Sequence, residues 1–210
     1  MSVNALYTDL SGYYDLMCVD IDYRAQSNAI HRLHQLFGNA GSQHLDLACG
    51  TGPHVRHFLD VGYTSSGLDI HQPMLDLAAT RCPEAHFSLQ DMGQFQVDEP
   101  VDLITCFLYS IHYNANLEKL SACIASAHRA LRTGGVLCFN SVDKERIDNA
   151  LRTRLPDHHP VGQRVWQCHL RVREARRLRY HLSRQLSWLG RCCCCTPIRK
   201  LRSIWSLHSR

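Results

Sequence analysis

Apolar and polar positions follow two different periods along residues 24–141. Within residues 24–37, apolar side chains recur at the spacing of a helix, whereas "HLDLA" at 44–48 is a short apolar run typical of a buried strand. The same patterns predict further strands at 63–69, 85–90, 101–108 and 136–141. They predict one helix that begins at Pro53 and two further helices over 72–82 and 116–131.

This regular succession of strands and helices determines the expected fold class. Strands that alternate with helices form parallel sheets with right-handed crossovers, and helices then cover both faces. We therefore expect an α/β fold with a doubly wound, mostly parallel sheet. In such sheets ligands bind beyond the carboxyl ends of the strands, so candidate chemistry is sought there.

The loop after the first predicted strand is the most informative stretch, "LDLACGTGPH" at 45–54. Gly50 and Gly52 allow the backbone to approach a ligand closely, and the helix that follows offers free N–H groups. A plain tight turn is the alternative. A dinucleotide fingerprint would need a third glycine where Val55 stands, and a phosphate-binding P-loop would need Gly-Lys-Ser/Thr.

Acidic residues follow the next two predicted strands. Asp69 ends the second strand, where a carboxylate can accept hydrogen bonds from a ribose diol, although a turn or helix-cap aspartate would look the same. Asp91 follows the third strand and could accept from an exocyclic amine, with Met92 covering a ring. Met74 could pack on an adenine face or belong to the core.

The motifs "LDLACGTG", "GLDI" and "QDM" together resemble those of class I S-adenosylmethionine-dependent methyltransferases over about residues 1–150. The resemblance implies a Rossmann-like fold and S-adenosylmethionine as cofactor. It implies that the first loop passes under the methionine part, that the acid after the second strand binds the ribose, and that the residues after the third strand bracket the adenine. The cofactor-binding residues it implies here are Asp46, Ala48, Gly50, Gly52, Asp69, Ile70, Met74, Asp91 and Met92.

The N-terminal stretch "YTDLSGYYDLMCVDIDYR" at 7–24 is rich in tyrosine. It is similar to the helical cover of small-molecule N-methyltransferases, particularly those acting on nucleotide-linked amino sugars. That resemblance adds Tyr23 and Arg24 to the expected cofactor contacts and places Tyr14 near the donor methyl. Simple packing of an aromatic-rich segment is the alternative.

The stretch "FLYSIHY" at 107–113 follows the fourth predicted strand, where the family places methyl transfer. Methyl transfer from a sulfonium needs alignment and exclusion of water, and a hydroxyl acceptor would also need a base. The candidate catalytic residues are Tyr14, Tyr109 and His112, with a capped loop histidine as the alternative for His112. His54 and His57 share a helix face without a third ligand, so no metal is expected.

Composition is that of an ordinary globular protein, with 45% hydrophobic and 20% charged residues. The sequence holds no apolar run long enough to span a membrane and no secretory signal pattern at its start, so we expect a cytoplasmic location. Cysteines number 11, and six of them stand singly among apolar neighbours, which favours buried thiols over ligands. These are Cys18, Cys49, Cys82, Cys106, Cys123 and Cys138.

Charge divides the chain into two unlike parts. Residues 1–157 hold 11 Lys/Arg and 18 Asp/Glu, a net charge of −7, whereas residues 158–210 hold 12 Lys/Arg and one acid, a net charge of +11. We expect a methyltransferase domain over 1–152 and an atypical tail over 153–210. An antiparallel strand pair should complete the sheet. The tail predicts one strand at 165–172 and a basic helix at 174–190, which suggests that this C-terminal strand pair is missing or abnormal.

The run "RCCCC" at 191–195 raises several alternatives for this tail. The stretch could be an out-of-frame or eroded terminus, a basic membrane or nucleic-acid tail, or a thiol site. The expected function is methyl transfer to a small-molecule amine or hydroxyl. The alternatives are an inactive relic that still binds the cofactor and, less favoured, a nucleic-acid methyltransferase, because residues 1–157 are acidic. Oligomeric state and acceptor identity are not encoded in recognisable motifs.

Overall fold

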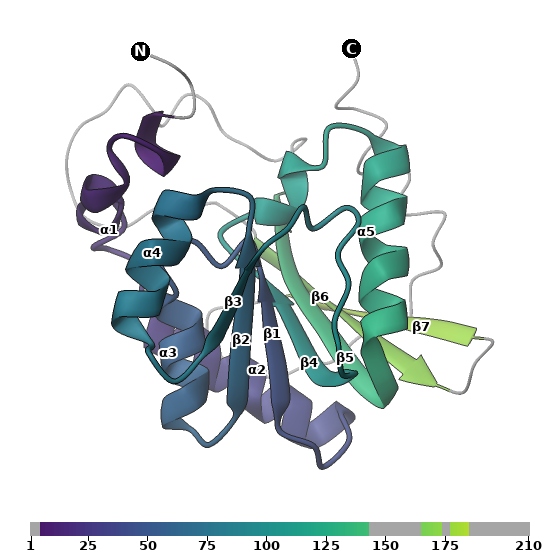
Figure 1. The fold of residues 1–210 in the computed structure, drawn as a ribbon. Helices are drawn as coiled ribbons and strands as arrows, with labels where there is room; N and C mark the ends of the chain where they lie inside the picture. Colours follow the sequence, from purple (N-terminus) through teal and green to yellow (C-terminus); the bar gives the residue numbers. More distant parts are fainter. Residues whose placement is uncertain (1–4, 143–164, 174–176, 185–210) are drawn as a thin grey trace, which may run out of the picture.

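A twisted sheet forms the centre of the molecule in the computed structural model, which describes residues 5–142, 165–173 and 177–184 (Figure 1). Within these residues the sheet has seven strands in the order β3-β2-β1-β4-β5-β6-β7. The strands from β1 to β5 are parallel, and β6 and β7 add an antiparallel pair beside β5. Their bounds are β1 Gln43–Leu47, β2 Thr64–Asp69, β3 His86–Leu89, β4 Val101–Cys106, β5 Leu131–Val142, β6 Val165–Arg173 and β7 Arg177–Arg184.

Four longer helices connect the parallel strands or precede them. They are α2 Tyr23–Phe37, α3 Pro53–Asp60, α4 Gln72–Arg81 and α5 Leu117–Ala130. The Asp22 side chain caps α2 by accepting from the Ala25 N–H at 2.8 Å, and proline stands in the first turn of α3 and of α4. Short turns of helix make up the rest: η1 Ala5–Tyr7, η2 Ser11–Tyr13, α1 Tyr14–Met17 and η3 Ser110–Tyr113.

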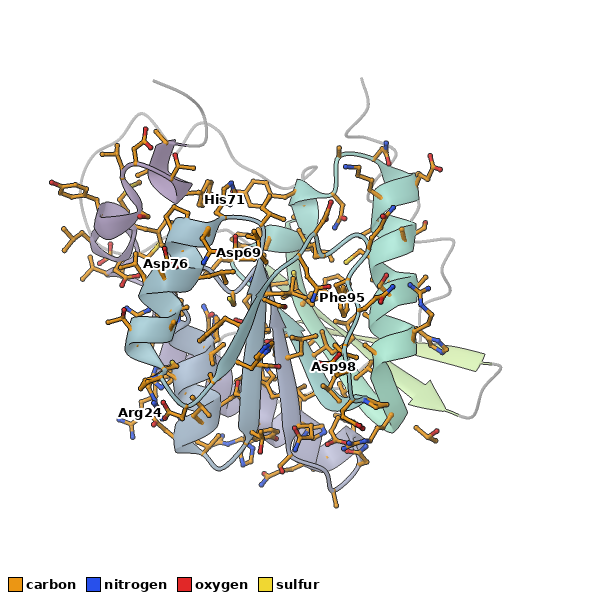
Figure 2. All side chains as sticks on the ribbon, in the orientation of Figure 1. Arg24, Asp69, His71, Asp76, Phe95 and Asp98 are labelled. Atoms are coloured by element: carbon orange, nitrogen blue, oxygen red, sulfur yellow. The ribbon has the colours of Figure 1, made fainter. Side chains whose placement is uncertain are left out.

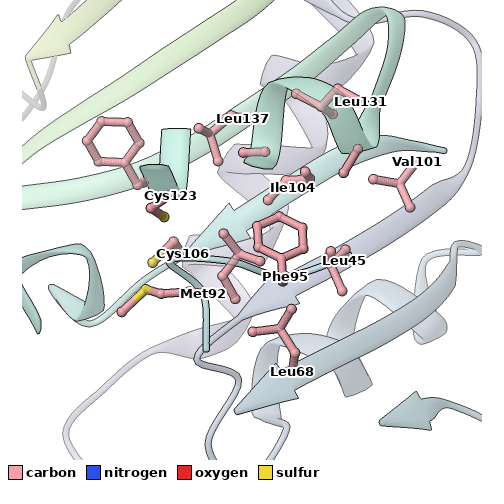
Figure 3. Close-up of a cluster of buried hydrophobic side chains, with 14 of the residues drawn as sticks. Leu45, Leu68, Met92, Phe95, Val101, Ile104, Cys106, Cys123, Leu131 and Leu137 are labelled. Carbon is pink, nitrogen blue, oxygen red and sulfur yellow. The ribbon is translucent and has the colours of Figure 1, made fainter. Parts of the chain in front are cut away.

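Alternating side chains of the strands build a core on each face of the sheet. On one face Ile104 and Cys106 of β4 pack with Cys123 and Ala127 of α5, and Figure 3 shows this cluster around Phe95. On the other face, Leu103 packs with residues of α2 and α3. The two faces explain why β4, in the middle of the sheet, is buried along its whole length.

The predicted doubly wound α/β fold is confirmed, with most element ends within two residues of expectation. The exception is β5, which begins at Leu131 rather than at 136 and so includes the "RTGG" stretch. Its pairing with β4 shifts register between Val101 and Leu103, and Gly134 has a φ of +82° there. The two glycines therefore interrupt the strand with an irregularity instead of preceding it.

The C-terminal strand pair, which the sequence suggested was missing or abnormal, is present as β6 and β7. The prediction of a strand at 165–172 is confirmed. The basic helix predicted over 174–190 is wrong over 177–184, because Arg177–Arg184 pair with β6 as a strand, and the rest of that range lies outside the described residues. Leucines at 178 and 182 are four apart, a spacing that fits both one helix face and one strand face. The proposed boundary at 152 and Cys192–Cys195 lie outside the described residues.

Within the described part of the chain, no helix is long and apolar enough to cross a membrane. Five of the six scattered cysteines are buried free thiols, as predicted, whereas Cys18 is only partly buried in the N-terminal segment.

Candidate cofactor and acceptor site

The loop after β1 adopts an unusual backbone. Ala48, Gly50 and Gly52 have φ values of +53°, +55° and +79°, a region that side chains disfavour. A Cβ on Gly50 would meet no atom within 4 Å, so this residue faces open space. A Cβ on Gly52 would lie 3.1 Å from the Cβ of Ala78, so Gly52 lets α4 pack closely instead. The two glycines of the motif therefore have different roles: Gly50 leaves space open, and Gly52 allows close packing of α4.

Asp69, at the end of β2, is tied to this loop. Its Oδ2 accepts from the Gly50 N–H at 3.0 Å, and its Oδ1 accepts from the His71 N–H at 3.0 Å. The residue is 7% exposed, so its carboxylate is held in one place before any ligand arrives. Nδ1 of His71 also lies 3.3 Å from Oδ1, whereas Oδ2 has the single partner Gly50 and retains a lone pair that can accept from a ligand hydroxyl.

A cavity of about 310 Å³ lies beyond the carboxyl ends of the central strands, at the low end of the usual range for ligand pockets. Figure 2 shows Asp69 and His71 together near this end of the sheet. The predicted residues that line the cavity are Tyr14, Ala48, Gly50, Asp69, Ile70, Met74, Asp91 and Met92. Residues from three successive strand ends therefore meet at one space, as the sequence led us to expect.

The N-terminal segment closes one side of this cavity. The ring of Tyr7 stacks on His71 with centroids 5.2 Å apart, and its hydroxyl lies 2.8 Å from that of Tyr113. Burial raises the pKa of Tyr7 and of Tyr14 well above the usual value, so both phenols stay protonated at neutral pH. Tyr7, Tyr14 and Tyr113 thus present a wall of neutral hydroxyls and aromatic faces to the cavity.

The loop after β4, which leads into Tyr113, lines the cavity as well and has a strained backbone. Leu108 and Tyr109 have φ values of +52° and +62°, which costs about 1–3 kcal/mol for a residue with a side chain. The N–H of Tyr109 donates to Oδ1 of Asn140 at 2.7 Å. Leu108 and Ser110 line the cavity as a result, whereas the side chains of Tyr109 and His112 are not among its lining residues.

A second, smaller cavity of about 30 Å³ lies beside the first, and Tyr14, Ala48, Gly50, Leu108 and Ser110 line both. Its remaining lining residues include Tyr23, Asp46 and His54. The Nε2 atom of His54 is buried and has no hydrogen-bond partner among the described residues. A buried, unpartnered nitrogen beside an extension of the main cavity is the feature expected where a polar ligand group belongs.

A line of hydrogen bonds crosses three strands below this cavity. The Thr105 hydroxyl donates to Oδ1 of Asp46 at 2.5 Å, and Nε2 of His44 lies 2.8 Å from the same hydroxyl. Nδ1 of His44 lies 2.6 Å from Oγ of Ser65. Burial lowers the pKa of His44 well below its usual value, so the ring is neutral and carries one proton. Because Thr105 already donates to Asp46, that proton is on Nε2, and Ser65 donates to Nδ1.

Burial also sets the charge states of Asp46 and His54, which line the smaller cavity. It raises the pKa of Asp46 to about 7, an effect that the Thr105 hydrogen bond opposes and that the nearby Asp69 carboxylate reinforces. It lowers the pKa of His54 to about 3, with a further contribution from His57, so this ring is neutral. A cationic group next to Asp46 would lower the pKa of Asp46 again.

Some predicted residues lie away from the main cavity. Tyr23 and Asp46 line the smaller cavity, and Gly52 packs on α4. Arg24 is exposed on α2 and lies toward the opposite end of the molecule from Asp69 in Figure 2, so the structure does not bring it to the site. Of the three catalytic candidates, Tyr14 alone is among the lining residues of either cavity.

Other lining residues were not selected from the sequence. They are Tyr7, Leu68, His71, Gln90, Leu108, Ser110, Tyr113, Asn114 and Lys119. Tyr7, Ser110 and Tyr113 belong to stretches that the aromatic and polar pattern had marked, so position relative to a strand end would have found them. Lys119 comes from the first turn of α5, which no motif connects to the site. Among the described residues, no group of His, Cys, Asp or Glu is placed to hold a metal ion.

Comparison with known proteins shows what this domain resembles. Residues 45–135 match the model of a methyltransferase domain. Over 131 residues the chain is 32% identical to dTDP-3-amino-3,4,6-trideoxy-alpha-D-glucopyranose N,N-dimethyltransferase of Streptomyces venezuelae, covering 61% of this chain and 55% of that relative. The chain thus spans about half the length of that protein.

Solved structures agree on the fold. An S-adenosylmethionine-dependent methyltransferase from Clostridium acetobutylicum superposes with a TM-score of 0.60 at 20% identity, over 83% of this chain and 78% of that one. Streptomyces venezuelae DesVI superposes with a TM-score of 0.59 at 27% identity, over 83% and 75% of the two chains. The chain therefore has the fold of S-adenosylmethionine-dependent methyltransferases, and its residues 45–135 are similar to a methyltransferase domain.

Proposed function

We propose that the chain is an S-adenosylmethionine-dependent N-methyltransferase that acts on the amino group of a small molecule, a nucleotide-linked amino sugar. The relative from Streptomyces venezuelae is named for such a reaction. The observation that carries the proposal is the meeting of Gly50, Asp69 and Asp91 from three strand ends in one cavity.

The described residues fit the proposed cofactor. Gly50 leaves room where a side chain would stand, and Asp69 is fixed by two main-chain donors with accepting capacity left for a ribose diol. Asp91 and Met92 lie beyond β3, where a purine edge and face could be met. The smaller cavity, of about 30 Å³ and lined by Asp46 and the unpartnered His54, has room for one polar group at the tip of the charged amino-acid end.

Bound there, S-adenosylmethionine would supply a sulfonium methyl group, so that the amine lone pair would form a C–N bond to the methyl carbon in line as the C–S bond breaks and S-adenosylhomocysteine leaves. The protein's contribution is alignment and exclusion of water, because an amine needs no stronger activation once it is neutral. Tyr7 and Tyr14 line the cavity from the N-terminal segment, and Leu108 and Ser110 line it from the loop after β4. We assign Tyr14 to orienting the acceptor, because it lines both cavities.

Calorimetric titration with S-adenosylhomocysteine tests the cofactor part of the proposal. The wild-type chain should bind, and Asp69→Ala should weaken binding at least tenfold because the ribose loses its acceptor. Asp76→Asn, an exposed change on α4, is the matched control and should leave binding unchanged. Absence of binding by the folded wild-type chain would refute the proposal.

Mass spectrometry then tests the acceptor. Incubation with S-adenosylmethionine and a dTDP-linked 3-amino sugar should yield a singly and then a doubly methylated product. A 3-hydroxy sugar of the same nucleotide should remain unmodified. Methylation of the hydroxy sugar alone would contradict the assignment to an amine.

A further inference from the structure

The N-terminal cover, residues 5–22, is attached to the domain by a small set of polar contacts. We propose that Asp15, Thr51 and Arg81 form a reversible latch that holds this cover closed and slows release of the bound cofactor. The part concerning the cofactor rests on the proposed function, whereas the latch itself is a property of the protein alone. Asp15 and Arg81 are positioning residues in this proposal, because neither lines the main or the smaller cavity. Thr51 lines the smaller cavity, and its hydroxyl is used here only through its contacts with Asp15 and Arg81.

The three side chains form a closed ring of hydrogen bonds. The Thr51 hydroxyl donates to Oδ1 of Asp15 at 2.6 Å, and Nη2 of Arg81 donates to Oδ2 of the same carboxylate. Nη1 of Arg81 donates to the main-chain oxygen of Thr51 at 2.6 Å and to its hydroxyl oxygen at 2.8 Å. Each member therefore contacts both others.

This ring joins three segments that meet at the site. Asp15 belongs to α1 of the cover, Thr51 stands between Gly50 and Gly52, and Arg81 is the last residue of α4. Asp15 follows Tyr14, which lines both cavities. Release of the latch would therefore free the cover next to the side chain that closes the site.

Apolar burial contributes little to holding the cover. No residue of η1, η2 or α1 is buried within the described structure. Four large side chains of the cover point to solvent: Tyr13, Leu16, Met17 and Val19 are each more than 60% exposed, and the others are only partly buried. Directed contacts therefore add to this partial burial in fixing the cover, namely the latch and the contacts of Tyr7 with His71 and Tyr113.

The strength of the latch suits a cover that opens and closes. The side chains of Asp15 and Arg81 are 45% and 31% exposed, and exposed ion pairs are individually weak. Thr51 is 1% exposed, so the third member of the ring is rigidly placed. A weak pair seated on a fixed hydroxyl biases the cover toward closure without locking it.

Hydrogen exchange on the full chain without ligand tests the latch directly. Asp15→Asn and Thr51→Val should each accelerate exchange of the main-chain amides in residues 5–22, while the strands keep wild-type protection. Thr51→Ser retains the hydroxyl and should restore slow exchange. Asp20→Asn, an exposed change in the same segment, is the matched control. Unchanged exchange of the cover in Asp15→Asn would overturn the proposal.

Stopped-flow release of S-adenosylhomocysteine tests the effect on the site. Asp15→Asn should release it about three- to tenfold faster, the range that loss of a weak ion pair with one hydrogen bond allows. Thr51→Ser should release it at the wild-type rate. If exchange accelerates but release does not, the cover does not govern release and that half of the proposal is wrong. If the wild-type chain binds no S-adenosylhomocysteine, the proposed function fails while the exchange result still decides the latch.

Discussion

The side chain of Asn140 on β5 accepts a hydrogen bond of 2.7 Å from the main-chain N–H of Tyr109, in the loop that follows β4. Leu108 and Tyr109 both have left-handed backbones, and Asn140 is 5% exposed. A buried amide on the neighbouring strand therefore holds the strained wall of the cavity. Asn140 does not line the cavity, yet it determines where Leu108 and Ser110 stand.

Asn140→Ala should relax this wall. The main-chain N–H of Tyr109 would lose its acceptor in a partly buried place, so the free energy of unfolding should fall by about 1–3 kcal/mol. Turnover of an amino sugar should fall about tenfold or more through misalignment. Asn140→Asp retains an acceptor oxygen, so it should lose less stability and less turnover than Asn140→Ala. Equal loss in the two variants, measured by urea unfolding and steady-state kinetics, would show that the hydrogen bond is unimportant.

Gly50→Ala and Gly52→Ala should affect different properties. Both residues have positive φ, so both changes carry a similar backbone cost of about 1–2 kcal/mol. Only at Gly52 would the new Cβ crowd Ala78, and only at Gly50 would it enter the open space of the cavity. We expect Gly50→Ala to abolish measurable binding of S-adenosylhomocysteine with the smaller loss of stability. The reverse order, by calorimetry and thermal unfolding, would refute the assignment.

Asp46 should make stability depend on pH in an unusual direction. Its pKa is about 7 in the folded protein against 3.8 in the unfolded chain, so the folded state binds the extra proton between these values. The contribution of Asp46 is therefore full below about pH 4 and is lost as the pH rises toward 7. The unfolding free energy of the wild type, minus that of Asp46→Asn, should fall by a few kcal/mol over this range. A difference that stays constant with pH would contradict the raised pKa.

His54→Phe should discriminate between two ligands. Methylthioadenosine lacks the amino-acid end of S-adenosylhomocysteine, so it does not need the smaller cavity. The variant should bind S-adenosylhomocysteine about tenfold more weakly, since one hydrogen bond to a charged group is lost. It should bind methylthioadenosine as the wild type does. An equal loss for both ligands would mean that the substitution disturbs the whole site.

The sequence predicted which residues follow successive strands and meet at the site, but it did not predict where every candidate side chain lies. Gly50, Asp69 and Asp91 follow successive apolar runs, and parallel strands bring such positions to one edge, so their meeting was predictable. Arg24 was assigned by resemblance, and helix α2 carries it to the far side. A residue's place on a helix depends on packing that no single motif encodes.

Contacts between residues far apart in the sequence could likewise not be predicted from local sequence patterns. Asp15 and Arg81 are 66 positions apart, and Tyr109 and Asn140 are 31 apart, with intervening elements that must pack before either contact exists. The wrong prediction over residues 174–190 has a different cause. Leucine at every fourth position satisfies both the helical and the strand period, and pairing with β6 decides between them.

The hydrogen-bonded line from Ser65 through His44 and Thr105 to Asp46 restricts which substitutions this sheet can accept during evolution. Each side chain in the line provides the hydrogen-bond donor or acceptor that its neighbour needs, and the four side chains come from three adjacent strands. Loss of one member leaves the next with an unmet donor or acceptor in the interior. In homologous sequences these four positions should therefore covary: either all four residues are polar or all four are apolar, and combinations of the two are rare.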